Sequence, residues 1–183
     1  MPSAIDPHGI WLLPHPDGQL WDPKLAIFLA GLFQGKTVID LGCGLCHYLK
    51  AWRQAGVDVD GMDGSPFVAD LRLGCYVMDL AEPILFAKSN YDWAFCLEVG
   101  EHIPPEHAGT FLDNVAAAAR EGIVLSWAVP GQPGHGHVNC RPNEWVIWQL
   151  ELRGFALDRR LTRFVREIAY LPYLRQTLVV FRL

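Results

Sequence analysis

Short apolar segments alternate with longer amphipathic segments along almost the whole chain. Several of the short segments are apolar almost throughout, which is typical of strands buried on both faces. The segments between them carry apolar residues at helical spacing. This alternation predicts an α/β fold in which helices cover both faces of a mostly parallel sheet. The expected strands are residues 37–42, 59–64, 75–80, 92–99, 122–129 and 177–183.

Capping residues mark the expected helices. Asp22 is expected to cap a helix that begins at Pro23. Asn143 is expected to cap a later helix that Gly154 stops. Two crossover helices and a final amphipathic stripe are expected at residues 48–52, 108–119 and 161–168.

Length and composition predict one domain with one large core. The chain has 183 residues, of which 51% are hydrophobic. We expect a single domain over residues 1–183, with a cap segment and helix at 1–36 and a catalytic core at 37–183. The N-terminus lacks the pattern of a secretory signal, and the apolar runs are too short to span a membrane. The expectation is a soluble cytoplasmic protein without a membrane partner.

Charge is distributed unevenly. The net charge is −5, but residues 141–183 hold eight arginines and four acidic residues. Such a basic tail suits either a phosphate-bearing substrate or, more commonly, a solvated helix face.

The stretch Val38–His47, VIDLGCGLCH, fits three chemistries. Its cysteines match a haem attachment site or a dithiol pair, and DLGCG matches a glycine turn under a nucleotide. Haem attachment would require export, and a dithiol enzyme usually has a smaller sheet, so both are disfavoured. A dinucleotide turn would need glycine where His47 stands. Asp40 would repel a diphosphate but could hold a cationic amine, which favours a nucleotide bearing an amino acid.

The chain resembles the class I S-adenosylmethionine-dependent methyltransferases, through the order and spacing of motifs from WDPKLA to TLVVF. Asp40 precedes the glycine turn, while Asp63 and Asp79 follow the next two strands. The resemblance implies a Rossmann-like, doubly wound, seven-stranded sheet with S-adenosylmethionine as the cofactor. Cys46 departs from the family, which usually has a third glycine there. The expected cofactor-binding residues are Asp40, Gly42, Cys43, Gly44, Asp63, Gly64, Asp79, Leu80 and Cys96.

An E-x-x-E-H motif follows the fourth expected strand, with Glu98, Glu101 and His102. It resembles the motif of plant-type small-RNA 2'-O-methyltransferases and ubiquinone-pathway O-methyltransferases. In the RNA enzymes a further His lies seven residues before a Glu, and His137 has that spacing here, with His135 as a substitute. The resemblance implies that Glu98, Glu101, His102 and His137 bind a divalent metal, Mg or Mn.

Without a metal, His102 or His137 is expected to act as general base, because neutral imidazole suits proton abstraction near pH 7. The expected catalytic residues are therefore His102, His137 and Glu101. Trp127 is expected to line the site, whereas Trp145 and Trp148 are expected to pack against the sheet.

These features predict a methyltransferase acting on a hydroxyl oxygen of a small molecule or an RNA end. Recognition of that acceptor is expected from the segments 8–21 and 130–141. Two alternatives stay open, namely a metal-independent N-methyltransferase and a non-catalytic module that binds the cofactor.

Overall fold

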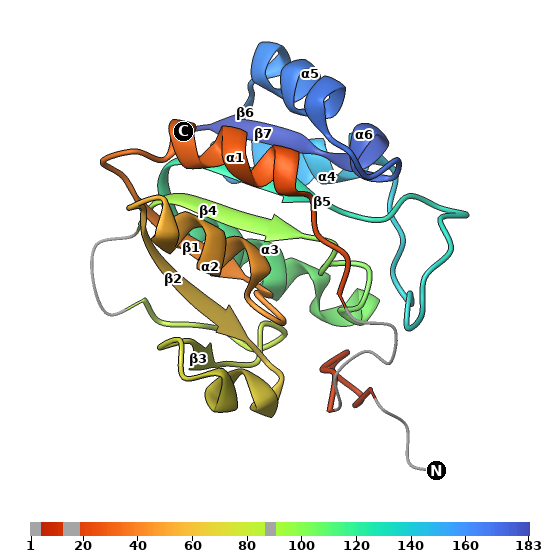
Figure 1. Cartoon of the computed structure of the whole chain (residues 1–183). Coiled ribbons are helices and arrows are strands. Elements are labelled where there is room, and N and C mark those ends of the chain that lie inside the picture. The colour runs from red at the N-terminus through yellow and green to blue at the C-terminus, as the bar shows by residue number, and fades with distance from the viewer. Residues whose placement is uncertain (1–4, 13–18, 87–90) are drawn as a thin grey trace.

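The computed structural model describes residues 5–12, 19–86 and 91–183, and contains a seven-stranded mixed sheet (Figure 1). The strand order is β3-β2-β1-β4-β5-β7-β6. The first five strands in that order run parallel, and β7 runs antiparallel to both of its neighbours. The strands are β1 Thr37–Leu41, β2 Asp58–Asp63, β3 Tyr76–Val77, β4 Tyr91–Leu97, β5 Ala119–Ser126, β6 Ala156–Leu157 and β7 Val179–Arg182. The predicted α/β fold is confirmed.

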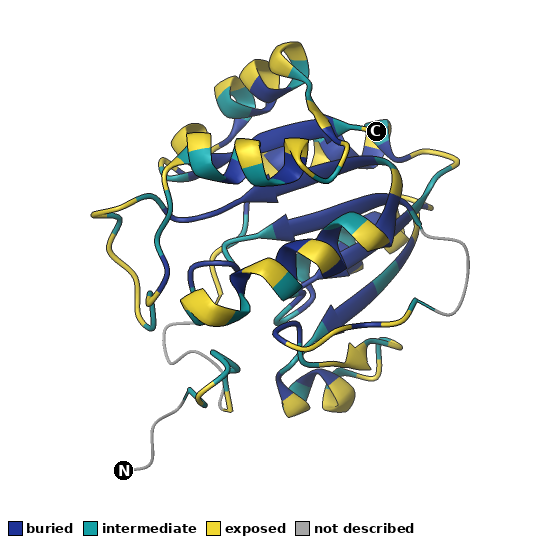
Figure 2. Ribbon diagram, turned by 180° about the vertical axis from the view of Figure 1, so that it is seen from behind, coloured by how far each residue is buried: buried dark blue, intermediate teal, exposed yellow. Residues whose placement is uncertain are grey.

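Helices cover both faces of this sheet (Figure 1). The helices are α1 Pro23–Leu32, α2 His47–Gln54, α3 Ala108–Ala118, α4 Asn143–Glu151, α5 Arg159–Ile168 and α6 Leu174–Thr177, with 3-10 turns at Pro66–Leu71 and Pro105–His107. Apolar residues of α1, α2 and α5 pack on one face of the sheet, and those of α3 and α4 pack on the other. The outer surfaces of the helices remain exposed, while the central strands are buried (Figure 2).

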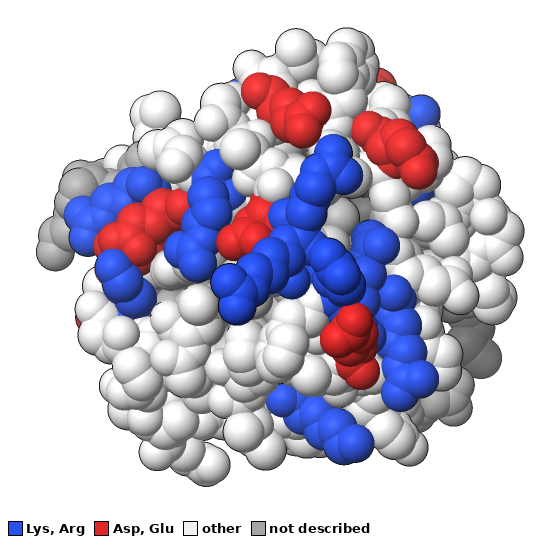
Figure 3. Space-filling view, turned by 90° about the horizontal axis from the view of Figure 1, so that it is seen from above, with Lys and Arg blue, Asp and Glu red and all other residues white. Residues whose placement is uncertain are grey.

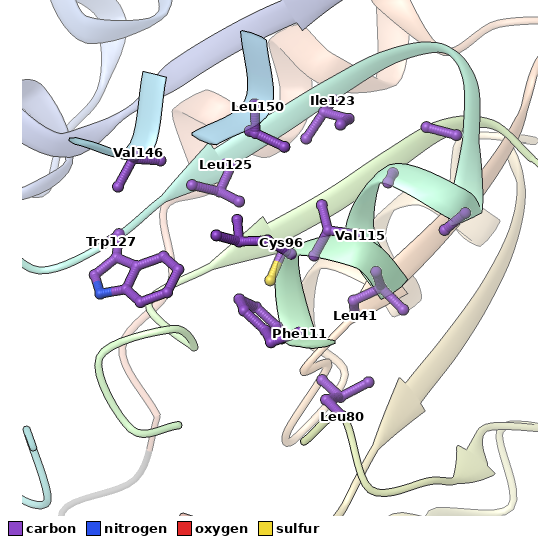
Figure 4. Packing of buried hydrophobic residues seen from close by; sticks show 14 of the residues in the cluster. Leu41, Leu80, Cys96, Phe111, Val115, Ile123, Leu125, Trp127, Val146 and Leu150 are labelled. Atoms are coloured by element: carbon purple, nitrogen blue, oxygen red, sulfur yellow. The ribbon is translucent and has the colours of Figure 1, made fainter. Parts of the chain in front are cut away.

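The two cores follow from the alternation of side chains along each strand. In β4, Trp93 and Phe95 pack toward α1 and α2, whereas Ala94 and Cys96 pack toward α3. Figure 4 shows this second core, where Cys96 lies near Phe111. A strand segment that is buried on both faces is mostly apolar, which explains the runs Trp93–Leu97 in β4 and Ile123–Leu125 in β5.

The order of the strands reverses between β1 and β4. From β1 the chain continues outward through β2 and β3, then returns to β4 on the opposite side of β1. Ligands of open α/β sheets bind outside the carboxyl ends of the strands at such a reversal. The fold therefore predicts a ligand site at the segments that follow residues 41, 63 and 97.

Several boundaries differ from the sequence-based predictions. Asn143 is the first residue of α4 and Pro142 stands at the N-cap, so the predicted Asn143 cap is wrong. The third strand comprises residues 76–77 instead of 75–80, and β5 begins at Ala119. Trp148 was expected to be buried but is 54% exposed. The short β6 and α6 were not predicted.

Asp22 is confirmed as the cap of α1 and joins two distant segments. One carboxylate oxygen accepts a hydrogen bond from the backbone N of Leu25 at 3.0 Å. The other accepts from the backbone N–H groups of Tyr170 and Leu171. The side chain is fully buried, so the carboxylate is both a helix cap and an anchor for the segment before α6.

We predict that Asp22→Ala lowers the free energy of unfolding by about 2–4 kcal/mol, because a cap and two further charged hydrogen bonds are lost. Urea denaturation measures this change. Lys24→Ala, at an exposed position in the same helical turn, is the matched control and should stay within about 0.5 kcal/mol of the parent. Equal stabilities of the two variants would contradict the anchoring role.

Candidate functional site

A cavity of about 370 Å³ opens at the carboxyl ends of β1, β2 and β4. Its walls come from the loops that follow these strands, from the segment before α6 and from the N-terminal segment. In Figure 1 the arrowheads of β2 and β4 point toward that N-terminal segment. The cavity thus lies at the strand reversal that the topology indicates.

The glycine loop after β1 forms one wall of the cavity. Gly42 and Gly44 have φ angles of 81° and 49°, in the left-handed region that glycine adopts most readily. A Cβ on Gly42 would lie 2.3 Å from Val99 Cγ2. The backbone N of Gly44 donates to Asp63 Oδ2 at 2.8 Å. Close packing and backbone conformation both require glycine at position 42.

Three carboxylates from successive strands line the cavity, at Asp40, Asp63 and Asp79. Burial raises the pKa of Asp40 well above its usual range and raises that of Asp63. Asp63 Oδ1 accepts from the backbone N of Ser65 at 2.8 Å, while its other oxygen holds Gly44. Of the remaining positions expected to bind the cofactor, Gly42, Cys43, Gly44, Gly64 and Leu80 also line the cavity.

Two expected pocket residues lie elsewhere. The side chain of Cys96 is fully buried in the core between β4 and α3 and does not line the cavity (Figure 4). Trp127 is 1% exposed, packs edge-on against Phe111, and donates from Nε1 to the carbonyl of Asn139. Cys96 lies within β4 and Trp127 directly after β5, and both side chains pack into the core that includes α3 instead of lining the cavity.

The N-terminal segment of residues 8–11 lies across the cavity. His8 Nδ1 is 2.6 Å from Asp79 Oδ2, and Ile10 packs so closely on Gly64 that a Cβ there would lie 2.6 Å from Ile10 Cγ1. The hydroxyl of Ser65 donates to the carbonyl of Trp11, whose ring meets the His102 ring edge-on at 5.9 Å. The segment forms an outer wall of the cavity. Residues 8–21 were expected to recognise the acceptor, and residues 13–18 of that range lie outside the described residues.

Glu101, His102 and His137 converge beside the cavity. One potential ligand atom from each lies within 4.8 Å of the other two. Glu101 is fully buried, and neither of its carboxylate oxygens has a hydrogen-bond partner among the described residues. Burial, with a further contribution from Glu98, raises its pKa well above the usual range. His137 Nε2 lies 3.9 Å from Glu101 Oε1. A buried carboxylate without a hydrogen bond is a costly arrangement unless a proton or cation compensates for it.

The imidazoles of this cluster face the cavity. Burial, with a smaller contribution from His137, lowers the pKa of His102 to about 4. His102 Nδ1 lies 3.2 Å from the carbonyl oxygen of Gly136, which can only accept, so Nδ1 carries the proton and Nε2 is left with its lone pair. His102 is therefore a neutral imidazole with an available basic nitrogen.

Glu98 stands apart from this cluster, although the metal hypothesis included it. Its carboxylate accepts from Ser126 Oγ at 2.7 Å and from Gln132 Nε2 at 2.6 Å. Its φ of 54° turns the chain sharply at the end of β4. The structure thus brings together three of the four expected ligands, and Glu98 instead holds the loop that contains Gln132.

Some cavity residues were missed by the sequence analysis. Gln19 Oε1 accepts from the backbone N of Leu45 at 2.7 Å, and Tyr173 lines the wall before α6, where burial raises its pKa to about 12. Neither belongs to a motif, because both reach the cavity through tertiary packing. The segment containing Gln19 had been recognised, but not this contact.

Comparison with known proteins supports a methyltransferase fold. No protein-family model matches the chain. A ubiquinone biosynthesis O-methyltransferase from Bordetella avium is 37% identical over 86 residues, which are 42% of this chain and 36% of that protein. A sphingolipid C9-methyltransferase A from Emericella nidulans is 33% identical over 119 residues, covering 53% of this chain and 22% of that protein. The chain thus spans well under half the length of both curated relatives.

Solved structures share the fold at low identity. A 1,6-didemethyltoxoflavin N1-methyltransferase from Burkholderia thailandensis, bound to S-adenosylhomocysteine, superposes with a TM-score of 0.61 at 22% identity, over 87% of this chain and 76% of that one. An O-methyltransferase family protein from the same organism gives 0.66 at 15% identity, over 86% and 55% of the two chains. The chain therefore has the Rossmann-like fold of class I S-adenosylmethionine-dependent methyltransferases, with neighbours named for both N- and O-methylation. No helix in the described part of the chain is long and apolar enough to cross a membrane.

We predict that the pKa of His8 lies above its ordinary value of 6.5, because the Asp79 carboxylate accepts its hydrogen bond and attracts its charge. The ion pair between protonated His8 and Asp79 is fully formed when the pH is below the ordinary pKa of histidine. Its stabilising effect is lost as the pH rises through the raised pKa of His8. A proton NMR titration, with His8 assigned by the His8→Ala variant, measures the shift. Asp79→Asn should bring the pKa back down, and an unchanged value in that variant would contradict the contact.

Proposed function

We propose that the chain is an S-adenosylmethionine-dependent methyltransferase whose cofactor binds in the cavity at the ends of β1, β2 and β4. The observation that carries this proposal is the convergence of the glycine loop and three strand-end carboxylates on one cavity. Each carboxylate has a different group of the cofactor to satisfy. The curated relatives and the structural neighbours, which are named as methyltransferases, support the same conclusion.

The amino-acid part of the cofactor would lie on the glycine loop beside Asp40. Asp40 is only 3% exposed, and this burial opposes ionisation of its carboxyl group. A cationic amine nearby would favour the ionised carboxylate and be held by it. The small residues of the loop let the backbone approach the ligand.

The nucleoside part would bind Asp63 and Asp79. Asp63 uses each oxygen for only one backbone N–H, and a carboxylate has about four lone-pair sites, so both ribose hydroxyls can still donate to it. Asp79 would accept from the adenine amino group, and Leu80 would pack beside the base. Because His8 already contacts Asp79, it would share this carboxylate with adenine or move aside when the cofactor binds.

We infer that the acceptor is a hydroxyl group on a small molecule. Among the described residues, the cavity lining holds no lysine or arginine. The arginines gather instead on another part of the surface (Figure 3), where Arg159, Arg163, Arg166 and Arg175 line a groove with residues of α4. A cavity without cations offers no direct partner for the phosphates of an RNA end, which makes the small acceptor the better fit.

His102 would act as general base in the transfer. The acceptor oxygen attacks the methyl carbon of the sulfonium, the bond between this carbon and sulfur breaks, and sulfur keeps the electron pair. The hydroxyl proton moves to His102 Nε2, which leaves a methyl ether, S-adenosylhomocysteine and an imidazolium. Two features support this role, namely the neutral ring and the Nδ1 contact with Gly136 that orients it.

Glu101, His102 and His137 also fit a divalent metal ion. The buried Glu101 carboxylate has no hydrogen bond within the described residues, and it lies with two imidazoles whose ligand atoms are close enough to share one ion. Two nitrogen ligands and one oxygen favour Mn²⁺ over Mg²⁺, which prefers oxygen alone. Such an ion would lower the pKa of the acceptor hydroxyl and so replace His102 as the means of activating it.

The cofactor assignment predicts that Asp63→Ala weakens S-adenosylmethionine binding by about a hundredfold, because two hydrogen bonds to a charged group are lost. Isothermal titration calorimetry measures this affinity. Asp58→Ala is the matched control, since Asp58 lies at the exposed amino end of the same strand, and should bind like the parent. Unaffected binding in Asp63→Ala would refute the proposed cofactor site.

The metal assignment predicts one Mn²⁺ per chain, measured by electron paramagnetic resonance, and at least tenfold weaker binding in Glu101→Gln and His137→Ala. Glu106→Gln, at an exposed position five residues from Glu101, serves as the control and should keep the parent affinity. Mn²⁺ binding that all three variants retain would contradict this site. In that case His102 remains the activating group, and methyl transfer should persist in the presence of EDTA.

A further inference from the structure

Three cysteines lie together beside the glycine loop. Cys46 Sγ is 3.3 Å from Cys75 Sγ and 3.6 Å from Cys43 Sγ. All three sulfur atoms lie within 4.8 Å of one another, and none of the cysteines is in a disulfide. They come from the end of β1, the N-cap of α2 and the residue before β3. The cluster therefore joins three separate elements of the fold.

Gly61 of β2 provides the space for this cluster. A Cβ at this position would lie 2.9 Å from Cys75 Sγ and 3.0 Å from Cys43 Sγ. The φ angle of Gly61 lies outside the left-handed region, so its backbone conformation does not require glycine. What excludes a side chain at Gly61 is the space that the sulfur atoms, together with Leu49, occupy.

Cys46 adopts an unusual backbone conformation within the cluster. Its φ of 59° and ψ of 33° are left-handed, which is uncommon for residues other than glycine, asparagine and aspartate. It stands at the N-cap of α2, yet its side chain makes no capping hydrogen bond. Its thiol instead meets the other two thiols.

The separations suit three thiolates around one ion. With metal–sulfur bonds of about 2.3 Å in a tetrahedral site, neighbouring sulfur atoms lie about 3.8 Å apart. The observed 3.3 Å and 3.6 Å separations need outward shifts of a few tenths of an ångström to reach that value, and the separation of Cys43 Sγ from Cys75 Sγ is within 4.8 Å. Cys75 is partly exposed while Cys43 and Cys46 are buried, so an ion would reach the site from the Cys75 side.

The surrounding charges favour a divalent ion. Three thiolates and a divalent ion carry a net charge of −1. The positive charge of Lys50 favours the thiolate of Cys46, and that of Arg53 favours the thiolate of Cys75. The negative charges of Asp40 and Asp63 disfavour the thiolate of Cys43, but the same charges would attract the metal ion. Soft sulfur ligands select Zn²⁺ among the common divalent ions that favour tetrahedral sites.

We propose that Cys43, Cys46 and Cys75 form a binding site for a soft divalent metal ion of the Zn²⁺ type, distinct from the site at Glu101, His102 and His137. A water molecule would complete the tetrahedron on the exposed side. Binding converts the thiols to thiolates and releases their protons. This site does not depend on the proposed methyl transfer.

The first test uses the unmodified full chain and Cd²⁺, a soft probe whose bonds to thiolate give an ultraviolet charge-transfer band. One equivalent should produce the band, and Zn²⁺ should compete for the site. The band should be lost in Cys75→Ser and persist in His137→Ala, in which the other candidate site is damaged. A band of equal size in Cys75→Ser would overturn the proposal.

A second measurement needs no variant and remains decisive if a cysteine substitution prevents folding. Iodoacetamide labelling of the native chain, mapped by peptide mass spectrometry, should modify the partly exposed Cys75 and Cys140 in the absence of metal. One equivalent of Zn²⁺ should lower the labelling rate of Cys75 at least tenfold and leave that of Cys140 unchanged. Protection of Cys140, whose Sγ lies 3.8 Å from His137 Nδ1, with Cys75 still labelled would place the ion at the other site and refute the proposal.

Discussion

The hydrogen bond from the backbone N of Gly44 to Asp63 Oδ2 joins the loop that follows β1 to the loop that follows β2. The other oxygen of Asp63 holds Ser65, so one carboxylate sets the course of both loops. The N-terminal segment can pack across the cavity only because Gly64 and Ser65 are held in place beneath Ile10 and Trp11. The shape of the cavity therefore depends on this single carboxylate.

Two buried carboxyl groups with raised pKa values lie at or beside the cavity. Asp40 is almost fully buried and Glu101 fully so, and burial raises the pKa of both. Carboxyl groups in such surroundings destabilise a fold unless a proton, a hydrogen bond or a cation compensates for them. Two separate compensating cations, an amine beside Asp40 and a metal ion beside Glu101, would explain both positions. Perturbed carboxyl groups beside a cavity are typical of functional sites.

Much of the fold was predictable because it rests on long, periodic segments. The strands around residues 37–42, 59–64 and 92–99 were identified because short segments with apolar residues alternate with longer helical segments along the chain. The two-residue β3 and β6 lack enough residues to show periodicity, and their pairing depends on neighbouring strands. The roles of Asp40, Asp63 and Asp79 were inferred from their positions at strand ends, and these positions do converge. Their binding roles remain predictions.

The misplacement of Cys96 has a simple cause. Side chains alternate between the two faces of a strand, so a shift of one position moves a residue from cavity wall to core. Phe95 and Leu97 line the cavity while Cys96, between them, packs against α3. The sequence identifies which strand ends at a site, but the face of each residue near that end is decided by twist and packing.

The cluster of three cysteines also could not be predicted from the sequence, because it brings together residues that are far apart along the chain. Cys43 and Cys46 form a recognisable pair in sequence, but no role for their thiols in a nucleotide turn follows from that pair alone. Cys75 lies 29 residues beyond Cys46 and joins them only because β3 pairs with β2. Cys43 lines the cavity through the same loop that carries Gly44. An ion bound to its sulfur would thus change the energy of the loop that holds the cofactor, and by linkage the cofactor would change the affinity for the ion by the same factor.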